Sequence, residues 1–420
     1  MTAPHRLAAL WIVAIAGGAT WMDSIHTGWV PGYLIAIAAL SLQWWLYAGI
    51  PREEAHWLRW WIPGSLSMLL ALLAPPALSD DVFRYLWEGH VQNQGYSPFG
   101  HAPESLFPSL AHPAEPYLNH PHLPAIYPPL AQALFRLADG LGHHVFTWKL
   151  ILMTSLMLTR WFLPVRTFML LMFHPLVLVE GIWNAHLDLA GLVLVWALFR
   201  TAGRSKSNGG PGLLGAALFS LKIVPAVFLP MSVANRSFGR QCHSAAVCGL
   251  AVVASYLPFL MDGAGLFQSL STFSSQWYFN NPNFYALAHL GSPESARVVL
   301  TLTLGAGLIW LYLHRGVGIR DRCRSAWLLV LLCSPTVYPW YLLWLLPLTR
   351  PRHWYLVAIA YAAASLSYWI LIDYHRSGSW QIHPAWLIGE WLVLYGCFWR
   401  LWPASLRSLD DLVRFRPIPR

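Results

Sequence analysis

The feature that most constrains this chain is the recurrence of long apolar runs from one end to the other. Runs of about 17 to 23 residues are long enough for a helix to cross the ~30 Å hydrocarbon layer of a bilayer. Because 56% of the 420 residues are hydrophobic and 11% are charged, the chain carries more apolar surface than one globular core could bury. We therefore expect an all-α polytopic membrane protein, with residues 1–420 forming a single integral membrane domain.

The distribution of basic residues predicts the topology. As ordinary spans, the apolar segments 211–233 and 325–348 would place a run of arginines outside, against the positive-inside rule. As two re-entrant or broken helix hairpins, they leave both termini and most of the 27 Lys and Arg residues in the cytoplasm. The turns would fall near Lys222 and between Ser334 and Pro339, and proline-kinked spans are the alternative. About ten spanning helices remain, at residues 7–22, 29–50, 57–78, 145–163, 167–183, 186–200, 244–262, 297–314, 354–372 and 385–402.

This topology leaves two polar segments outside the membrane and one tail inside. The first extracytoplasmic loop, residues 79–144, lies between spans 3 and 4, and we expect it to be ordered by short helices. The second, residues 262–296, contains no Lys or Arg, whereas residues 403–420 form a basic cytoplasmic tail. Because the net charge of +9 comes from short loops between apolar runs, membrane orientation explains it better than a nucleic-acid partner does.

The sequence indicates no required cofactor. Gly210, Gly212 and Gly215 have the spacing of a dinucleotide-binding motif, but an apolar helix follows them and no strand precedes them. A phosphate-binding loop of the GxxxxGK[ST] type is absent from the sequence. Asp80, Asp81 and the histidines of the first loop could hold a divalent metal ion, although no spacing demands one.

Two adjacent carboxylates, Asp80 and Asp81, lie where the third span leaves the membrane. Carboxylates at this depth are costly unless they are solvated, paired or used. On a helix that continues outward, Asp81 shares a face with Arg84 and Tyr85. A general base is one interpretation of Asp81, and an acidic helix cap is the other.

Two further polar features lie in otherwise apolar sequence. Glu180, Asn184, His186 and Asp188 fall at the outer junction of the fifth and sixth spans, and either a cavity wall or hydrogen bonding between helices would explain them. Lys222 would lie about 15 Å deep, where it needs an anion and where helix N-termini also favour negative charge. Arg297 could complete such an anion site or simply anchor its span at the interface.

Several segments between about residues 78 and 350 match the pattern of a known family. They are Asp80-Asp81-Val-Phe-Arg-Tyr85-Leu-Trp-Glu-Gly89-His-Val-Gln92, Gly95-Tyr-Ser-Pro98-Phe, Tyr127-Pro128-Pro129-Leu-Ala-Gln132, the Glu180 to Asp188 cluster, Lys222-Ile-Val-Pro225 and Ser334-Pro-Thr-Val-Tyr-Pro-Trp340-Tyr341. Together they resemble the GT-C superfamily of polyprenyl-phosphate-sugar-dependent glycosyltransferases, in particular bacterial mannosyltransferases and the related GPI mannosyltransferases. The resemblance implies an enzyme that takes a hexose, with mannose expected, from a polyprenyl-phosphate donor and passes it with inversion to a lipid or glycan acceptor.

The resemblance also places this chemistry on the extracytoplasmic face of a bacterial cytoplasmic membrane, with membrane lipids as surroundings, and assigns the catalytic carboxylate to Asp81, with Asp80 beside it. For the donor phosphate we predict Lys222, Arg297 and Arg84. For the sugar or acceptor we predict Tyr85, Trp87, Glu88, Tyr127, Asn184, His186, Asp188, Tyr338, Trp340 and Tyr341. A transporter or flippase of lipid-linked substrates is the alternative function, because such proteins also use broken helices and buried charges.

Overall fold

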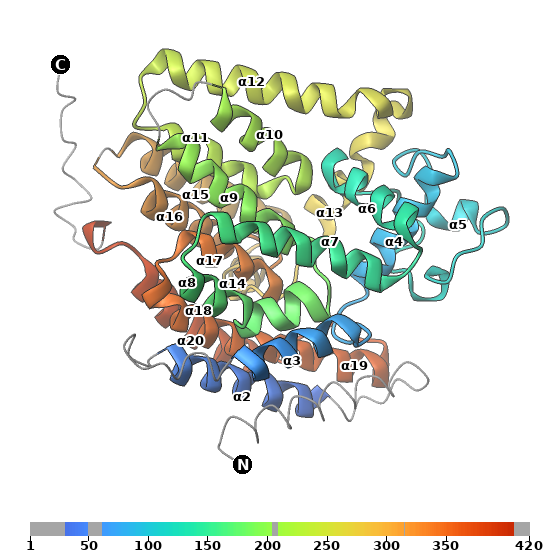
Figure 1. The fold of residues 1–420 in the computed structure, drawn as a ribbon, viewed down its shortest axis with the longest axis horizontal. Helices are drawn as coiled ribbons and strands as arrows, with labels where there is room; N and C mark the ends of the chain where they lie inside the picture. The colour runs from blue at the N-terminus through green and yellow to red at the C-terminus, as the bar shows by residue number, and fades with distance from the viewer. Residues whose placement is uncertain (1–29, 49–60, 204–208, 315, 407–420) are drawn as a thin grey trace.

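The computed structural model describes residues 30–48, 61–203, 209–314 and 316–406 (Figure 1). These residues form an all-helical protein, and the isolated β-bridge among them joins Phe279 to Thr336. The prediction of an all-α fold is therefore confirmed for the described part. The predicted span at residues 7–22 and residues 407–420 of the basic tail lie outside it.

Three helical stretches among the described residues are long and apolar enough to cross a membrane: Phe238–Gly263, Pro293–Leu313 and Pro351–Ser377. They comprise α12 (Phe238–Tyr256) with the start of η8 (Leu257–Phe267), then α15 (Pro293–Leu313), and finally η10 (Pro351–His353), α18 (Trp354–Ala364), η11 (Ser365–Trp369) and α19 (Ile370–Ser377). Length and composition thus support membrane spans without establishing ten of them. Other predicted spans coincide with α2 (Val30–Ala48), α3 (Trp61–Leu73), α7 (Val145–Leu158) with η5 (Thr159–Trp161), α9 (Asp188–Ala202) and α20 (Pro384–Leu401), which η12 (Ala404–Leu406) follows.

Both apolar segments that were expected to break do so at the predicted residues. In the first, α10 (Gly210–Leu221) stops at Lys222, whose backbone is extended, before η7 (Val224–Val227) and α11 (Phe228–Val233) continue. In the second, α16 (Ile319–Cys333) is separated by residues 334–338 from η9 (Pro339–Trp344) and α17 (Leu345–Leu348). Pro335 and Pro339 lack the N–H that a continuous helix needs, which explains the second break.

A third broken helix corrects the prediction of one continuous span at residues 167–183. Here α8 (Val165–Met172) and the π-helix η6 (Val177–Trp183) meet at an angle of 70°. Pro175 lies in the gap, and its ring clashes with the carbonyl four residues earlier in a continuous helix. A short π-helix such as this seven-residue one is a local irregularity that is frequent at functional sites.

Residues 79–144, the predicted first extracytoplasmic loop, are ordered by short helices. They contain α4 (Asp81–Asn93), α5 (Pro103–Leu106), η4 (Glu115–Tyr117) and α6 (Pro129–Leu141), which gather at one end of the molecule, at the right of the view (Figure 1). The rings of Tyr85 and Phe135 stack with centroids 4.7 Å apart and join α4 to α6. Gly89 allows this close approach, because a Cβ there would lie 2.2 Å from the Phe135 carbonyl oxygen. The second loop contains α13 (Gln268–Gln276) and α14 (Pro282–Leu290).

Candidate active site where the broken helices meet the first loop

The end of η6 holds the chain that leads into the two aspartates. Pro75 and Pro76 follow α3 and explain why it ends at Leu73, five residues before the predicted end of that span. The Asn184 side-chain oxygen accepts hydrogen bonds from the backbone N–H groups of Ala77 (3.2 Å) and Leu78 (3.1 Å). The Trp183 indole donates to the Pro75 carbonyl oxygen at 2.6 Å. These bonds place the start of α4 beside residues 184–188.

His186 lies between two carboxylates. Its Nδ1 is 3.7 Å from Asp81 Oδ2, and its Nε2 is 3.4 Å from Glu180 Oε2. The imidazole is fully buried and stacks on the Trp340 indole with ring centroids 3.9 Å apart. The preceding residue, Ala185, has a φ of 59°, which is uncommon for a residue with a side chain and is typical of strained functional segments. Neither ring nitrogen of His186 has a hydrogen-bond partner among the described residues, so each carboxylate is a close neighbour of the imidazole without being bonded to it.

Glu180 anchors the inner end of this chain of polar groups. Tyr361 donates its hydroxyl to Oε1 at 2.7 Å, and Tyr368 donates to Oε2 at 2.8 Å. Glu180 is completely buried, so these hydroxyl donors compensate for the water that its carboxylate loses. His186 thus lies between the partly exposed Asp81 and a buried carboxylate that the tyrosines of α18 and η11 hold by hydrogen bonds.

The two aspartates are held from the loop side by Asn119. Its amide nitrogen donates to Asp80 Oδ1 at 2.8 Å and to Asp81 Oδ1 at 3.3 Å. Desolvation by the surrounding protein groups and the charge of Asp81 raise the pKa of Asp80 to about 6, although part of the residue is exposed at the surface. The Asp81 side chain is 23% exposed, which leaves a route for an acceptor molecule.

Arg84 organises the same loop. Its Nε pairs with Glu88 Oε1 at 2.8 Å, and its other nitrogens donate to the carbonyl oxygens of Asn119, His120 and Leu123. Arg84 therefore positions the segment that carries Asn119. The predicted role of Arg84 on a donor phosphate stays a prediction, because the described guanidinium contacts are all with the protein's own loop.

Lys222 has an anionic partner within the protein. Its Nζ lies 2.9 and 2.8 Å from the two carboxylate oxygens of Asp188, which also accepts a hydrogen bond from Trp344 Nε1 at 2.5 Å. The ammonium group stands over the Tyr341 ring, 4.6 Å from its centroid. The break in α10, the start of α9 and the helix after Pro339 thus converge on one buried ion pair, in which Lys222 keeps 19% of its side chain exposed.

The remaining predicted site residues divide into those near this centre and those away from it. The Tyr85 and Tyr127 hydroxyls are 3.3 Å apart, and the Tyr338 ring stacks on Trp340 with centroids 4.3 Å apart. Trp87 instead packs with Val91 and Leu106 in a separate apolar cluster of the loop, and Glu88 pairs with Arg84 and Gln132. Arg297 donates to the carbonyl oxygens of Ser274 and Trp277 in the second loop.

Sequence reasoning missed four contributors to this region. Asn119, Trp344, Tyr361 and Tyr368 reach their carboxylate partners across 35 or more positions of sequence, and no local pattern marks such pairs. A fifth omission, Lys149, was visible as a lysine inside the predicted span 145–163. It is fully buried, and its Nζ donates to the carbonyl oxygens of Ala71 (2.8 Å) and Ala74 (2.5 Å) at the end of α3.

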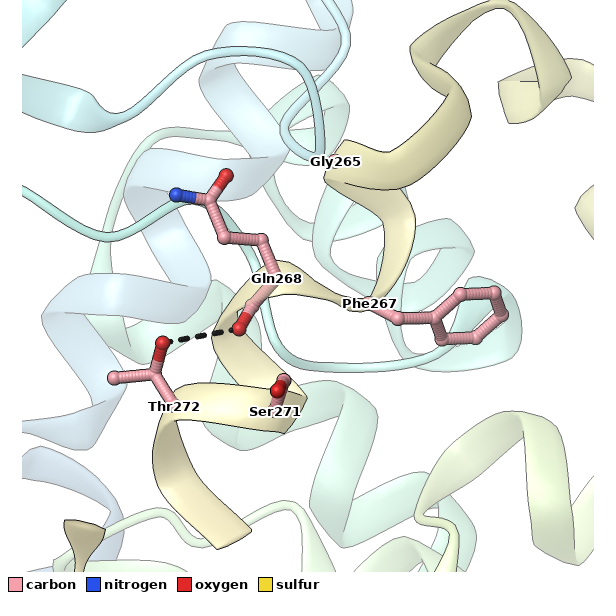
Figure 2. Close-up of a pocket in the computed structure, with 5 residues that line it drawn as sticks. All are labelled: Gly265, Phe267, Gln268, Ser271 and Thr272. Atoms are coloured by element: carbon pink, nitrogen blue, oxygen red, sulfur yellow. Dashed lines mark hydrogen bonds between the residues drawn. The ribbon is translucent and has the colours of Figure 1, made fainter. Parts of the chain in front are cut away.

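Two hollows in the surface flank the outer region. One, of about 400 Å³, is lined mostly by apolar residues from the end of α3 and the start of α7, with Phe83 and Lys149 among them. Figure 2 shows the other, of about 470 Å³, lined by Gly265, Phe267, Gln268, Ser271 and Thr272. The Thr272 hydroxyl donates to the Gln268 carbonyl oxygen at 3.1 Å there. Because none of these five side chains is ionisable, we do not place proton transfer in the second hollow.

One group among the described residues has the composition of a metal site: His90, His112, Asp139 and His143. It lies toward the far end of α4 from Asp81.

No protein-family model, curated protein or solved structure matches this chain. The functional conclusion therefore rests on the geometry of the side chains.

Proposed function

We propose that this protein is an inverting membrane glycosyltransferase of the GT-C type. It moves a hexose, with mannose as the expected sugar, from a polyprenyl-phosphate donor to a hydroxyl of a lipid or glycan acceptor. The observation that carries the proposal is the partly exposed Asp81 carboxylate beside the buried His186, in the region where the broken helices also hold Lys222. A base open to an acceptor and a cation near the membrane are the two groups that this transfer requires.

In the proposed reaction, Asp81 accepts the proton of the acceptor hydroxyl as its oxygen attacks the anomeric carbon. The bond between that carbon and the phosphate oxygen breaks, and its electron pair leaves with the polyprenyl phosphate. Attack from the face opposite the leaving group inverts the anomeric centre. Asn119 donates a hydrogen bond to the Asp81 carboxylate and His186 lies beside it, so less reorganisation is needed when the proton moves.

The leaving phosphate needs charge stabilisation more than it needs a proton. Lys222 is the first candidate, because Asp188 and the Tyr341 ring already hold its ammonium group in place while part of its side chain stays exposed. The roles predicted for Arg297 and Arg84 remain secondary proposals. The apolar hollow beside Phe83 and Lys149 is suited to the isoprenoid chain of the donor.

The proposal includes a membrane arrangement. About ten spans and two re-entrant hairpins would place both termini in the cytoplasm of a bacterial cell and the first loop outside. The confirmed breaks at Lys222 and at residues 334–338 support the hairpins. Arginines also cap helix ends on the proposed cytoplasmic side: Arg322 Nε donates to the Leu311 carbonyl oxygen (3.0 Å) and Arg324 Nε to the Leu401 carbonyl oxygen (2.7 Å).

The test is the rate of transfer from a radiolabelled polyprenyl-phosphate sugar in membranes that contain the wild type or the Asp81→Asn variant. We expect the variant to lose at least about 100-fold in rate, the usual worth of a general base. Glu104→Gln, an exposed acidic residue of the same loop, is the matched control and should keep wild-type activity. A folded Asp81→Asn protein that retains more than about a tenth of the rate would contradict the assignment.

A transporter of lipid-linked substrates is the second candidate, because the meeting of three broken helices at buried charges is also a transporter feature. Such a protein would move the donor across the bilayer without cleaving it. Flux of intact donor across proteoliposomes that does not depend on Asp81 would favour this function.

A further inference from the structure

The histidine and aspartate group lies apart from the proposed site of transfer. His90 follows Asp81 by nine residues on α4, or about 14 Å along the helix axis. Asp139 lies near the end of α6, and His143 follows Gly142, whose φ of 148° turns the chain back after the helix. His112 comes from the segment between α5 and η4. Three separate parts of the first loop thus meet at one point.

The geometry of the group is close to that of a metal shell. One candidate ligand atom from each of the four side chains lies within 4.8 Å of the others. Asp139 Oδ1 is 3.5 Å from His90 Nδ1 and also contacts His143 Nδ1. Ligand atoms around a tetrahedral zinc ion are about 3.4 Å apart, given bonds of about 2.0–2.1 Å. Small side-chain rotations would therefore bring these atoms to bonding distance.

Two imidazole nitrogens in the group have no hydrogen-bond partner. They are His90 Nδ1 and His112 Nε2, both inaccessible to water. His112 is 7% exposed and Asp139 is 2% exposed. Most buried polar atoms in proteins have a partner, because leaving one without a partner is costly, so these two nitrogens point to a ligand that would satisfy them.

The surroundings of Asp139 and His112 also fit a metal site. Asn93 Nδ2 donates to Asp139 Oδ2 at 2.7 Å, which directs the other carboxylate oxygen toward the histidines. Such outer contacts orient metal ligands in proteins. His112 Nδ1 accepts a hydrogen bond from the Ala114 N–H at 3.1 Å, so the proton of its neutral ring lies on Nε2. That N–H can donate to a water molecule on the ion, but it cannot itself be a ligand.

We propose that His90, Asp139 and His143 bind a zinc ion, with a water molecule in the fourth position that is held by His112. Imidazole and carboxylate ligands favour a divalent transition metal over magnesium or calcium. The His143 side chain is 56% exposed, which provides the entry path. Bound zinc joins α4 to the end of α6 and so braces the helix that carries Asp81. This site does not depend on the proposed transferase activity.

The test uses the purified full-length protein in detergent, stripped of metal with a chelator and then titrated with zinc against a chromophoric competitor. We expect one zinc ion per chain, and a loss of affinity of more than about 100-fold in Asp139→Asn and His143→Ala. His112→Phe should lose about 10- to 100-fold, the usual effect of an outer-shell residue. His101→Ala, another histidine of the loop, is the control and should bind zinc as the wild type does.

Cobalt provides a second measurement that does not depend on the variants. Cobalt in place of zinc should give the intense visible absorption of a four-coordinate site in the wild type, and His143→Ala should lose it. Because His143 is mostly exposed, this variant is expected to fold. A wild-type protein that binds no zinc at micromolar concentration, or variants of Asp139 and His143 that bind it unchanged, would overturn the proposal.

Discussion

Removal of the Asn184 side chain tests most directly how the backbone before Asp80 and Asp81 is held in place. It is completely buried, and its oxygen accepts two hydrogen bonds from the backbone just before Asp80. Asn184→Ala would leave the N–H groups of Ala77 and Leu78 without a partner. Each buried unsatisfied donor costs about 1–3 kcal/mol, so we expect a loss of about 2–6 kcal/mol in the free energy of unfolding. We also expect transfer activity to fall, because Asp81 would no longer be held beside His186.

The measurement compares melting temperatures of the purified proteins in one detergent at one scan rate, because the apparent melting temperature depends on scan rate when unfolding is irreversible. Asn283→Ala is the matched control. It also removes two hydrogen bonds, to the Leu332 carbonyl oxygen and from the Tyr395 hydroxyl, but the latter is exposed to solvent. A melting temperature for Asn184→Ala that is no lower than that of Asn283→Ala would refute the proposal that Asn184 holds the backbone before Asp80.

Three further predictions concern the charged groups near Asn184. Lys222→Met leaves Asp188, which is 1% exposed, without its cation, and should cost about 3–5 kcal/mol in thermal unfolding, part of which the double variant with Asp188→Asn regains. Tyr361→Phe removes one donor from the Glu180 carboxylate and should cost about 1–3 kcal/mol in the same assay; no change would argue against this hydrogen bond. The pKa of Asp80 rises from 3.8 to about 6 on folding, so the stability that its protonated form provides is present below pH 4 and is lost as the pH rises to 6. The melting temperature of the wild type should therefore fall relative to that of Asp80→Asn as the pH rises through this window. A difference between the two proteins that does not change with pH would contradict this prediction.

The sequence predicted the helix breaks where a charge or prolines interrupt an apolar run. Lys222 marks one, and Pro335 with Pro339 marks the other. The break at Pro175 was missed, because residues 167–183 are long and apolar enough to pass for one span, and a proline inside a membrane helix often causes only a kink. Spacing along the chain could not show which partners Glu180 and Asn184 have at this point. Glu180 accepts from tyrosine hydroxyls, whereas Asn184 accepts from backbone N–H groups before Asp80.

The composition of the candidate site was more predictable than its pairing. Asp81, His186 and Asp188 are marked in the sequence as polar residues at the outer ends of apolar runs, and Lys222 is marked by its depth inside one. Their partners depend on contacts between segments that are distant in the sequence. The sequence predicted an external anion for Lys222, but in the structure its ammonium group forms an ion pair with Asp188. Arg84 was placed correctly on the same helix face as Asp81, but its guanidinium holds the loop of Asn119, and helix periodicity cannot reveal this contact.

The central claim is that a bond to the sugar is broken at Asp81, and a donor labelled separately in its sugar and in its phosphate tests this most directly. Purified protein in proteoliposomes would receive the donor together with a membrane extract that supplies acceptors. We predict that the two labels separate, with the sugar passing to an acceptor while the phosphate stays on the polyprenyl lipid, and that Asp81→Asn slows this separation at least about 100-fold. Labels that stay together and cross the bilayer at the same rate in wild type and variant would contradict the account.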